Sequence, residues 1–162
     1  MKIDFGFSWI GCPIVLLLFI PNIIWSKYSP QGYNAYVKQE NITLRILERL
    51  GEIAIICLLL ISQNFHIQGI DIHISLLVLA YVFMICYEIC WIRYFKSKRT
   101  MLDFYRSFLR IPLPLAILPI GAFVMLGLYG RHLYFIIATI VFGIGHIGIH
   151  LQHYQQIKEN IK

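Results

Sequence analysis

The chain has 162 residues, of which 59% are hydrophobic and 14% are charged, and its formal net charge is +6. Ordinary soluble domains are about 45–50% apolar and about 25% charged, so this composition excludes a typical soluble domain and predicts a protein whose solvent is lipid. The length suffices for one domain, and we expect a single integral membrane domain over residues 1–162.

Five apolar runs are long enough to cross a bilayer, which takes about 20 mostly apolar residues. We predict an all-α, five-span transmembrane helical bundle, with spans at about 5–25, 44–62, 72–91, 112–130 and 132–152. The first run is expected to remain as an uncleaved span, because it is long and no small-x-small cleavage site follows it.

A short cytoplasmic helix is predicted between the third and fourth spans. The sequence TMLD, from Thr100 to Asp103, has the spacing of a capping box, in which the first and fourth residues bond each other's backbone. We expect this helix to run to about Arg110. The sequence IPLP that follows disfavours helical geometry at Ile111 and Leu113, because each of them precedes a proline. The fourth span should therefore begin after this break.

The numbers of lysines and arginines in the loops predict the orientation, since cytoplasmic loops carry more of both. The side of the N-terminus has Lys2 and Arg131. Twelve basic residues fall on the other side: Lys27, Lys38, Arg45, Arg49, Arg93, Lys96, Lys98, Arg99, Arg106, Arg110, Lys158 and Lys162. We therefore predict an N-terminus outside and a C-terminus in the cytoplasm, with the plasma membrane as the location. The basic charge is then a topology signal, so we expect no nucleic-acid partner.

Four polar residues lie one to two turns inside the cytoplasmic ends of three predicted spans: Glu52, Glu88, His146 and His150. Polar side chains at that depth avoid lipid and face protein or water. We predict that they converge as a ligand-binding cluster, in which Glu88 has a buried partner. Two imidazoles and two carboxylates fit three alternatives: a zinc or iron ligand set, a proton-coupled binding site or a structural polar cluster. The metal and any cofactor remain unknown from the sequence.

The neighbours of this cluster carry further expectations. His146 is flanked by small residues that predict a close contact with another helix, namely Gly143, Gly145 and Gly148. His153 is expected to be solvated at the cytoplasmic interface. Glu48 is expected on a solvated helix face, salt-bridged to Arg45.

The cysteines point to packing rather than chemistry. All four lie in apolar runs without zinc-ribbon or CxxC spacing, as expected of buried thiols: Cys12, Cys57, Cys86 and Cys90. Cys86 and Cys90 share a helix face, which leaves a soft-metal role open. The sequence has no HExxH, GxSxG, P-loop or dinucleotide-binding pattern.

Four runs of the sequence carry a resemblance: PNIIW, ENITLRILERLGE, IPLPLAILPIGAFVMLGLYG and IVFGIGHIGIHLQHY. Together they resemble a group of small, uncharacterised multi-pass membrane proteins of bacteria. The runs span four of the five predicted helices. The resemblance implies a multi-pass bacterial membrane protein and brings no activity, ligand or mechanism with it.

Three functions are compatible with these patterns. The first is a binding or transport module for a small molecule or cation, with a polar pocket in the cytoplasmic half. The second is a membrane-embedded enzyme acting on a lipid or isoprenoid, with His146 and either Glu88 or Glu52 as acid and base. The third is an accessory subunit of a membrane complex. The lipid bilayer is the expected partner in each, and an oligomer or a protein partner is compatible with all three.

Overall fold

The structure is a computed structural model that describes residues 4–67 and 72–161, and within these ranges the fold is all-α. Its elements are α1 (Gly11–Lys27), α2 (Tyr33–Val37), α3 (Ile42–Ile61), the 3-10 helix η1 (Gln63–Phe65), α4 (Ile74–Phe95), α5 (Met101–Phe104), α6 (Pro114–Tyr129) and α7 (Leu133–Ile161). The five predicted spans correspond to α1, α3, α4, α6 and α7. Lys2, Gly69 and Lys162 lie outside the described residues.

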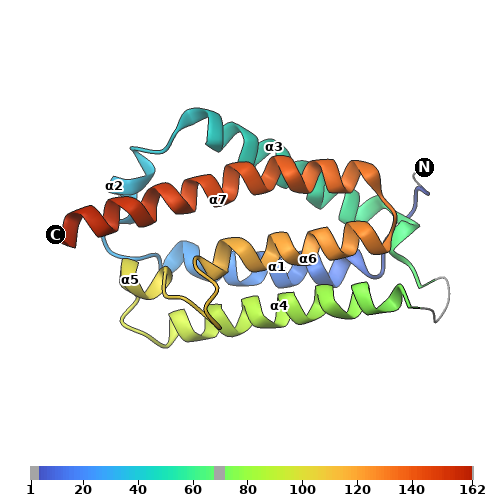
Figure 1. Cartoon of the computed structure of the whole chain (residues 1–162), viewed down its shortest axis with the longest axis horizontal. Helices are drawn as coiled ribbons and strands as arrows, with labels where there is room; N and C mark the ends of the chain where they lie inside the picture. The colour runs from blue at the N-terminus through green and yellow to red at the C-terminus, as the bar shows by residue number, and fades with distance from the viewer. Residues whose placement is uncertain (1–3, 68–71, 162) are drawn as a thin grey trace.

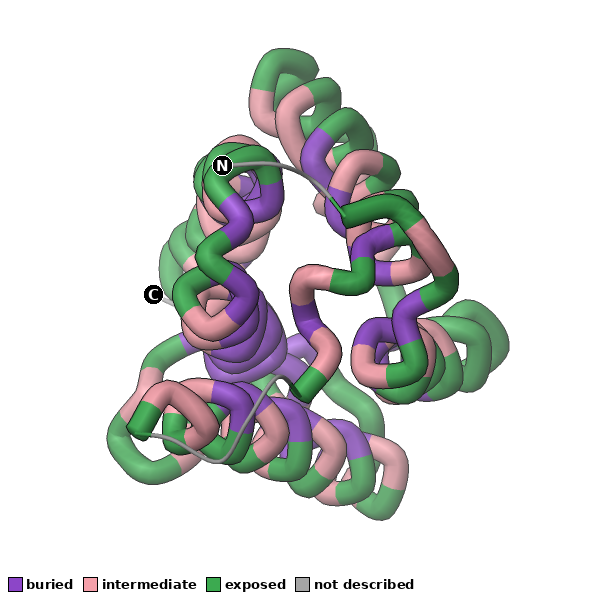
Figure 2. The backbone as a smooth tube through the Cα atoms, turned by 90° about the vertical axis from the view of Figure 1, so that its right-hand side faces the viewer, coloured by how far each residue is buried: buried purple, intermediate pink, exposed green. Residues whose placement is uncertain are grey.

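The five long helices run along one axis of the molecule, so the chain crosses its length repeatedly (Figure 1). Helices α2 and α5 and the C-terminus lie at one end, and the N-terminus lies at the other. The most extensive packing is between α3 and α7 and between α4 and α6, while α6 also packs on α7 and α1 packs on α3 and α4. Figure 2, turned by 90°, shows buried positions facing the inside of this bundle and exposed positions facing outward.

The first predicted span begins six residues too early. Residues 4–10 are not helical, because their backbone pairs with the end of α3: the Gly6 N–H donates to the Ile61 carbonyl at 2.9 Å, and the Ser8 N–H donates to the Leu60 carbonyl at 3.0 Å. The Ser8 Oγ atom then accepts a hydrogen bond from the Gly11 N–H at 2.9 Å, which satisfies a backbone donor at the helix start. Helix α1 therefore begins at Gly11 rather than near Phe5.

The capping box before the fourth long helix is confirmed. The Thr100 side chain accepts a hydrogen bond from the Asp103 N–H, and the Asp103 side chain accepts one from the Thr100 N–H. The helix ends at Phe104, however, and not near Arg110. Farther along the chain, Leu109 and Arg110 have positive φ angles of 49° and 66°, which are incompatible with a right-handed helix up to Arg110. The chain continues through a turn into α6, which starts at Pro114.

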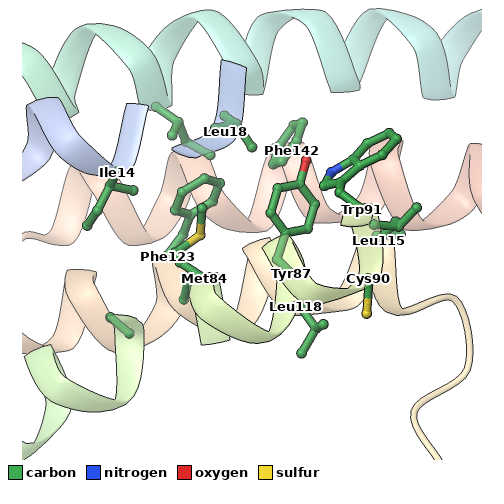
Figure 3. Packing of buried hydrophobic residues seen from close by; sticks show 14 of the residues in the cluster. Ile14, Leu18, Met84, Tyr87, Cys90, Trp91, Leu115, Leu118, Phe123 and Phe142 are labelled. Carbon is green, nitrogen blue, oxygen red and sulfur yellow. The ribbon is translucent and has the colours of Figure 1, made fainter. Parts of the chain in front are cut away.

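The apolar core runs along the middle of the bundle. Figure 3 shows Leu18 of α1, Tyr87 and Trp91 of α4 and Phe142 of α7 pointing into the space between these helices. Phe123 of α6 is fully buried in the same cluster. Burial of such side chains stabilises the folded chain by about 1.5–3 kcal/mol each.

Helices α3 and α7 meet at two glycines. A Cβ atom at Gly145 of α7 would lie 2.5 Å from the Leu44 carbonyl oxygen of α3, and a Cβ at Gly51 of α3 would lie 2.5 Å from the Phe142 Cα of α7. The backbones can approach so closely only because these residues have no side chain. The predicted glycine-mediated helix contact is therefore confirmed at Gly145, and it places the following residue, His146, against α3.

Two described helices are long and apolar enough to cross a membrane, α4 and α7. Helices α1 and α6 are apolar but have 17 and 16 residues, and the 20 residues of α3 include four charged ones. Two such helices weakly suggest association with a membrane. The five-span arrangement and its orientation remain predictions.

Candidate functional site

A cavity of about 480 Å³ opens in the half of the bundle that carries α2 and α5. It lies between the end of α1, the start of α3, the end of α4 and the second half of α7. Its polar lining comprises Asn22, Ser26, Tyr33, Glu40, Arg45, Glu48, Arg49, Glu52, Tyr87, His146 and His150. The remaining lining is apolar or aromatic: Leu18, Trp25, Val37, Trp91, Phe104, Leu115, Phe142 and Ile149. The cavity lining thus combines charged groups with aromatic rings.

The strongest polar contact in the cavity wall joins His146 and Glu48. The His146 Nδ1 atom lies 2.6 Å from the Glu48 Oε1 atom, and each side chain is 18% exposed. The prediction that Glu48 belongs to a solvated helix face is therefore wrong. The close crossing at Gly145 brings the His146 ring onto this turn of α3, and the α7 surface covers Glu48.

Glu52 and His150 line the same cavity in different ways. The Glu52 Oε2 atom accepts a hydrogen bond from Arg49 Nη1 at 3.0 Å on the rim, where the Arg49 side chain is exposed. The His150 ring stacks on Phe104 at 5.8 Å and meets the His146 ring edge-on at 4.5 Å. Within the described residues, His150 makes ring contacts and no hydrogen bond. Its nitrogens therefore remain available to a bound molecule.

Glu88 does not join the predicted cluster. It lies on α4 outside the cavity lining, and its Oε1 atom is buried without a hydrogen-bond partner among the described residues. The structure therefore brings Glu52, His146 and His150 together and leaves Glu88 apart. The expectation of a buried partner for Glu88 is also not met within the described residues. Residues at the same depth in a bundle do not always converge on one site, because each must also lie on the face of its helix that points toward that site.

His153 is fully buried, so the prediction that it is solvated is wrong. Its Nδ1 atom lies 3.0 Å from the Tyr105 hydroxyl. Its Nε2 atom lies 3.3 Å from the Glu40 Oε1 atom, within ion-pair distance although without hydrogen-bond geometry. The reason is that α7 continues to Ile161, past the predicted end at residue 152, and residues 33–40 lie across it. This covering segment buries what would otherwise be an interface histidine.

Glu40 is the cavity carboxylate that the sequence did not single out. Its side chain is 7% exposed, although it follows a short loop after α2. Burial, with a smaller effect from the nearby Glu48 carboxylate, raises the pKa of Glu40 above its ordinary value. The raised pKa means that Glu40 takes up a proton more readily than a solvated glutamate. The segment KQEN has no periodicity that could have revealed this burial.

Hydrogen bonds from the extension of α7 hold this covering segment in place. The Gln152 side chain donates to the Gln39 carbonyl and accepts from the Asn41 N–H at 3.1 Å. Asn41 in turn caps α3, since its Oδ1 atom accepts hydrogen bonds from the Thr43 and Leu44 N–H groups. The position of Glu40 is therefore fixed from both sides.

Aromatic rings line the same cavity as the carboxylates, among them Trp25, Tyr33, Trp91 and Phe104. The Trp25 and Tyr33 rings meet edge to face at 4.8 Å, and Phe104 lies 5.8 Å from both Trp25 and Trp91. The buried indole N–H of Trp25 has no hydrogen-bond partner among the described residues. The Trp91 N–H lies near the Tyr87 hydroxyl but forms no hydrogen bond of good geometry.

A metal centre is not supported within the described ranges. They contain no group of three or more histidine, cysteine, aspartate or glutamate residues placed to hold a metal ion. The four cysteines are free, and Cys57 is exposed. The wall offers paired carboxylates, arginines and aromatic faces instead, which suit hydrogen bonding and ion pairing with an organic molecule.

Set against known protein families, curated proteins and solved structures, the chain matches none of them.

Proposed function

We propose that this protein is a membrane-embedded binding module for a small molecule or organic cation, which it holds in the cavity between α1, α3, α4 and α7. The observation that carries the proposal is the convergence of three carboxylates, two arginines and several aromatic rings in the lining of one cavity. A volume of about 480 Å³ lies in the range typical of small-molecule sites, roughly 300–1,000 Å³. A purely structural polar cluster would be expected to close around its own groups rather than leave such a space.

The outer surface of the bundle supports a membrane location. One stripe of α4 is apolar and 44–57% exposed, and it consists of Val78, Val82, Ile85, Ile89 and Ile92. Such a stripe would be costly in water but is expected beside lipid. We therefore propose five spans, a cytoplasmic C-terminus and a plasma-membrane location, as in the small bacterial multi-pass proteins that the sequence resembles.

The distribution of basic residues along the bundle supports the same orientation. The segments that follow α1, α4 and α5 lie at the end that carries the C-terminus (Figure 1). They carry six of the fourteen lysines and arginines, namely Lys38, Lys96, Lys98, Arg99, Arg106 and Arg110, whereas Arg131 is the basic residue in the described segment between α6 and α7 at the opposite end. Basic segments favour the cytoplasmic face. The cavity then opens in the cytoplasmic half.

A second candidate function is membrane-embedded acid–base catalysis, and the His146–Glu48 contact favours it. A carboxylate 2.6 Å from an imidazole nitrogen orients the ring, as the partner of a catalytic histidine does. In this alternative His146 would act with Glu48, not with Glu88 or Glu52. Turnover of a lipid or isoprenoid by the purified protein, lost in His146→Gln, would favour catalysis over binding alone.

The binding function can be tested with a variant that fills the cavity. Val37 lines the cavity from α2, whereas Ala35 lies on the same helix outside it. We expect small ligands retained on the detergent-purified protein, seen by native mass spectrometry or by a thermal-shift panel, to be lost in Val37→Trp and kept in Ala35→Trp. Absence of any bound or stabilising small molecule on the parent protein would contradict the proposal.

A further inference from the structure

We infer that the ligand of this cavity is an organic monocation of the ammonium type, and that its binding releases protons held by two histidine–glutamate pairs. This inference rests on the proposed binding function and specifies the class of ligand and its linkage to pH. The basis of the inference is the identity of the side chain that pairs with each cavity carboxylate.

Two cavity carboxylates are each paired with a histidine. Glu48 pairs with His146 at 2.6 Å, and Glu40 lies 3.3 Å from His153. Both glutamates line the cavity, and His146 lines it beside Glu48, whereas His153 lies outside the lining. The third carboxylate, Glu52, pairs with Arg49, whose charge does not change near neutral pH. Two of the three contacts can therefore gain or lose a proton.

The protonation of these pairs changes the sign of the local charge. With neutral histidines, three carboxylates stand against the two guanidinium groups of Arg45 and Arg49, which leaves a formal charge of −1. A proton on each of His146 and His153 turns this charge into +1. A bound monocation neutralises the first state and is repelled by the second. Binding should therefore drive each imidazolium proton to solvent and leave a neutral imidazole.

The surroundings of the two histidines differ, and burial lowers the pKa of His153, so His153 takes up its proton only below the ordinary histidine range. His146 faces Arg45 and Arg49 on α3 in addition to Glu48, and His150 beside it on α7 has no carboxylate partner. His153 faces uncharged hydroxyl-bearing rings from α2 and the segment after α5, namely Tyr33, Tyr36 and Tyr105. From α1 and α4 the cavity receives Asn22, Ser26 and Tyr87, which are also uncharged.

The aromatic rings of the lining select an organic cation. Ammonium groups bind over the faces of tryptophan and tyrosine rings, and Trp25, Tyr33 and Trp91 supply such rings in the same lining as the carboxylates. A metal ion would instead need three or more convergent ligands, and the described residues offer no such group. The charged groups and the aromatic rings of the lining therefore suit the same ligand.

Titration calorimetry with tetraethylammonium chloride tests this inference on the full-length protein in detergent, with sodium chloride as the matched salt control. Measurements at about pH 5 and about pH 8 bracket the ordinary histidine pKa of about 6.5 and extend below it, toward the lowered pKa of His153. We expect tetraethylammonium to bind at least about tenfold more tightly at pH 8, because each released proton changes Kd by up to about tenfold per pH unit. Buffers of different ionisation enthalpy should report the release of about one to two protons.

Three variants locate the protons. His146→Gln and His153→Gln should each reduce both the pH dependence and the number of protons released, whereas His66→Gln should change neither, because His66 bonds the Trp9 N–H outside the cavity. If a variant fails to fold, the pH series on the parent protein decides alone. Binding of equal strength at both pH values would overturn the proton linkage. Failure of tetraethylammonium to bind, while neutral molecules still stabilise the protein, would overturn the ligand class and leave the proposed binding function intact.

Discussion

The His146 Nδ1 atom and the Glu48 Oε1 atom lie 2.6 Å apart beside Gly145, one of the two glycines at which α7 and α3 approach closely. The contact depends on the preceding residue, because Gly145 lets the α7 backbone reach the α3 backbone without an intervening side chain. The close packing of α7 on α3 therefore determines the position of this polar pair in the cavity wall. Packing and polar chemistry at this crossing can be perturbed separately.

Gly145→Ala should be strongly destabilising. The added Cβ would overlap the backbone of α3, including the Leu44 carbonyl oxygen at 2.5 Å, and neither helix can yield cheaply. Overpacking of this kind costs about 1–3 kcal/mol, so the melting temperature should fall. Gly143→Ala is the matched control, because its Cβ would meet only the Ile120 side chain at 3.4 Å. Equal melting temperatures for the two variants would contradict the close crossing.

A double-mutant cycle can measure the His146–Glu48 contact. We expect His146→Ala alone to cost about 1–3 kcal/mol of stability, because it leaves a mostly buried carboxylate without its partner. Glu48→Gln in the His146→Ala background should restore part of this loss, since the amide carries no charge. The two substitutions should therefore be non-additive in chemical or thermal denaturation. Simple additivity would mean that the two side chains do not interact in solution.

Glu88→Leu should raise the melting temperature. The Glu88 Oε1 atom is buried and has no hydrogen-bond partner among the described residues, so removing the carboxyl group orphans no donor there and relieves a desolvation cost of about 1–3 kcal/mol. Glu88→Gln should lie between the parent and the leucine variant. Glu159→Leu, at an exposed position of α7, is the control and should have little effect. A loss of stability in Glu88→Leu would reveal a partner, such as a bound ligand.

Apolar length predicted the long helices because the signal for a buried or lipid-facing helix is repeated over some twenty residues. The capping box of Thr100 and Asp103 and the contact at Gly145 were also predictable, since the signal for each is local: the sequence TMLD for the box, and the glycines around His146 for the contact. The C-terminal end of α7 could not be predicted in this way. Its last nine residues are mostly polar, and the segment 33–41 packs and hydrogen-bonds across them through Gln156 and Asn160.

The candidate site was predicted only in part, for a geometric reason. His146, His150 and Glu52 could be placed at one depth from the sequence, and they do line one cavity. Which carboxylate meets His146 depends on the rotation of α3 about its axis, and that rotation is set by the contacts at Gly51 and Gly145. Glu40 comes from a loop whose path no periodicity describes. Long-range partners of this kind are therefore the part that the sequence alone could not provide.

The orientation of the chain can be tested with reporters. If the proposed five-span topology holds, an alkaline phosphatase fusion after Lys162 should be inactive and a green fluorescent protein fusion there should be fluorescent. A phosphatase inserted near Gly69, between α3 and α4, should be active. Variants with uncharged substitutions in the cavity lining should give the same reporter results as the parent protein, because these substitutions do not alter the charges of the loops. The reverse pattern would reject the orientation.

His153 should matter more to stability than its position near the C-terminus suggests. It is fully buried, and its two ring nitrogens face the Tyr105 hydroxyl at 3.0 Å and the Glu40 carboxylate at 3.3 Å. His153→Ala would leave both groups without this partner and open a cavity under residues 33–40. We expect a loss of about 2–4 kcal/mol in the free energy of unfolding, at least as large as for His146→Ala.

Two further variants separate the contributions at His153. Tyr105→Phe removes only the hydroxyl that faces Nδ1, and it should cost about 1 kcal/mol. Glu40→Gln keeps the shape of the side chain but removes its charge, so it should weaken the contact with Nε2 without opening a cavity. Hydrogen exchange should show faster opening of residues 33–40 in His153→Ala than in Tyr105→Phe. If His153→Ala instead melts and exchanges like the parent protein, the histidine is solvated and the covering segment does not hold it.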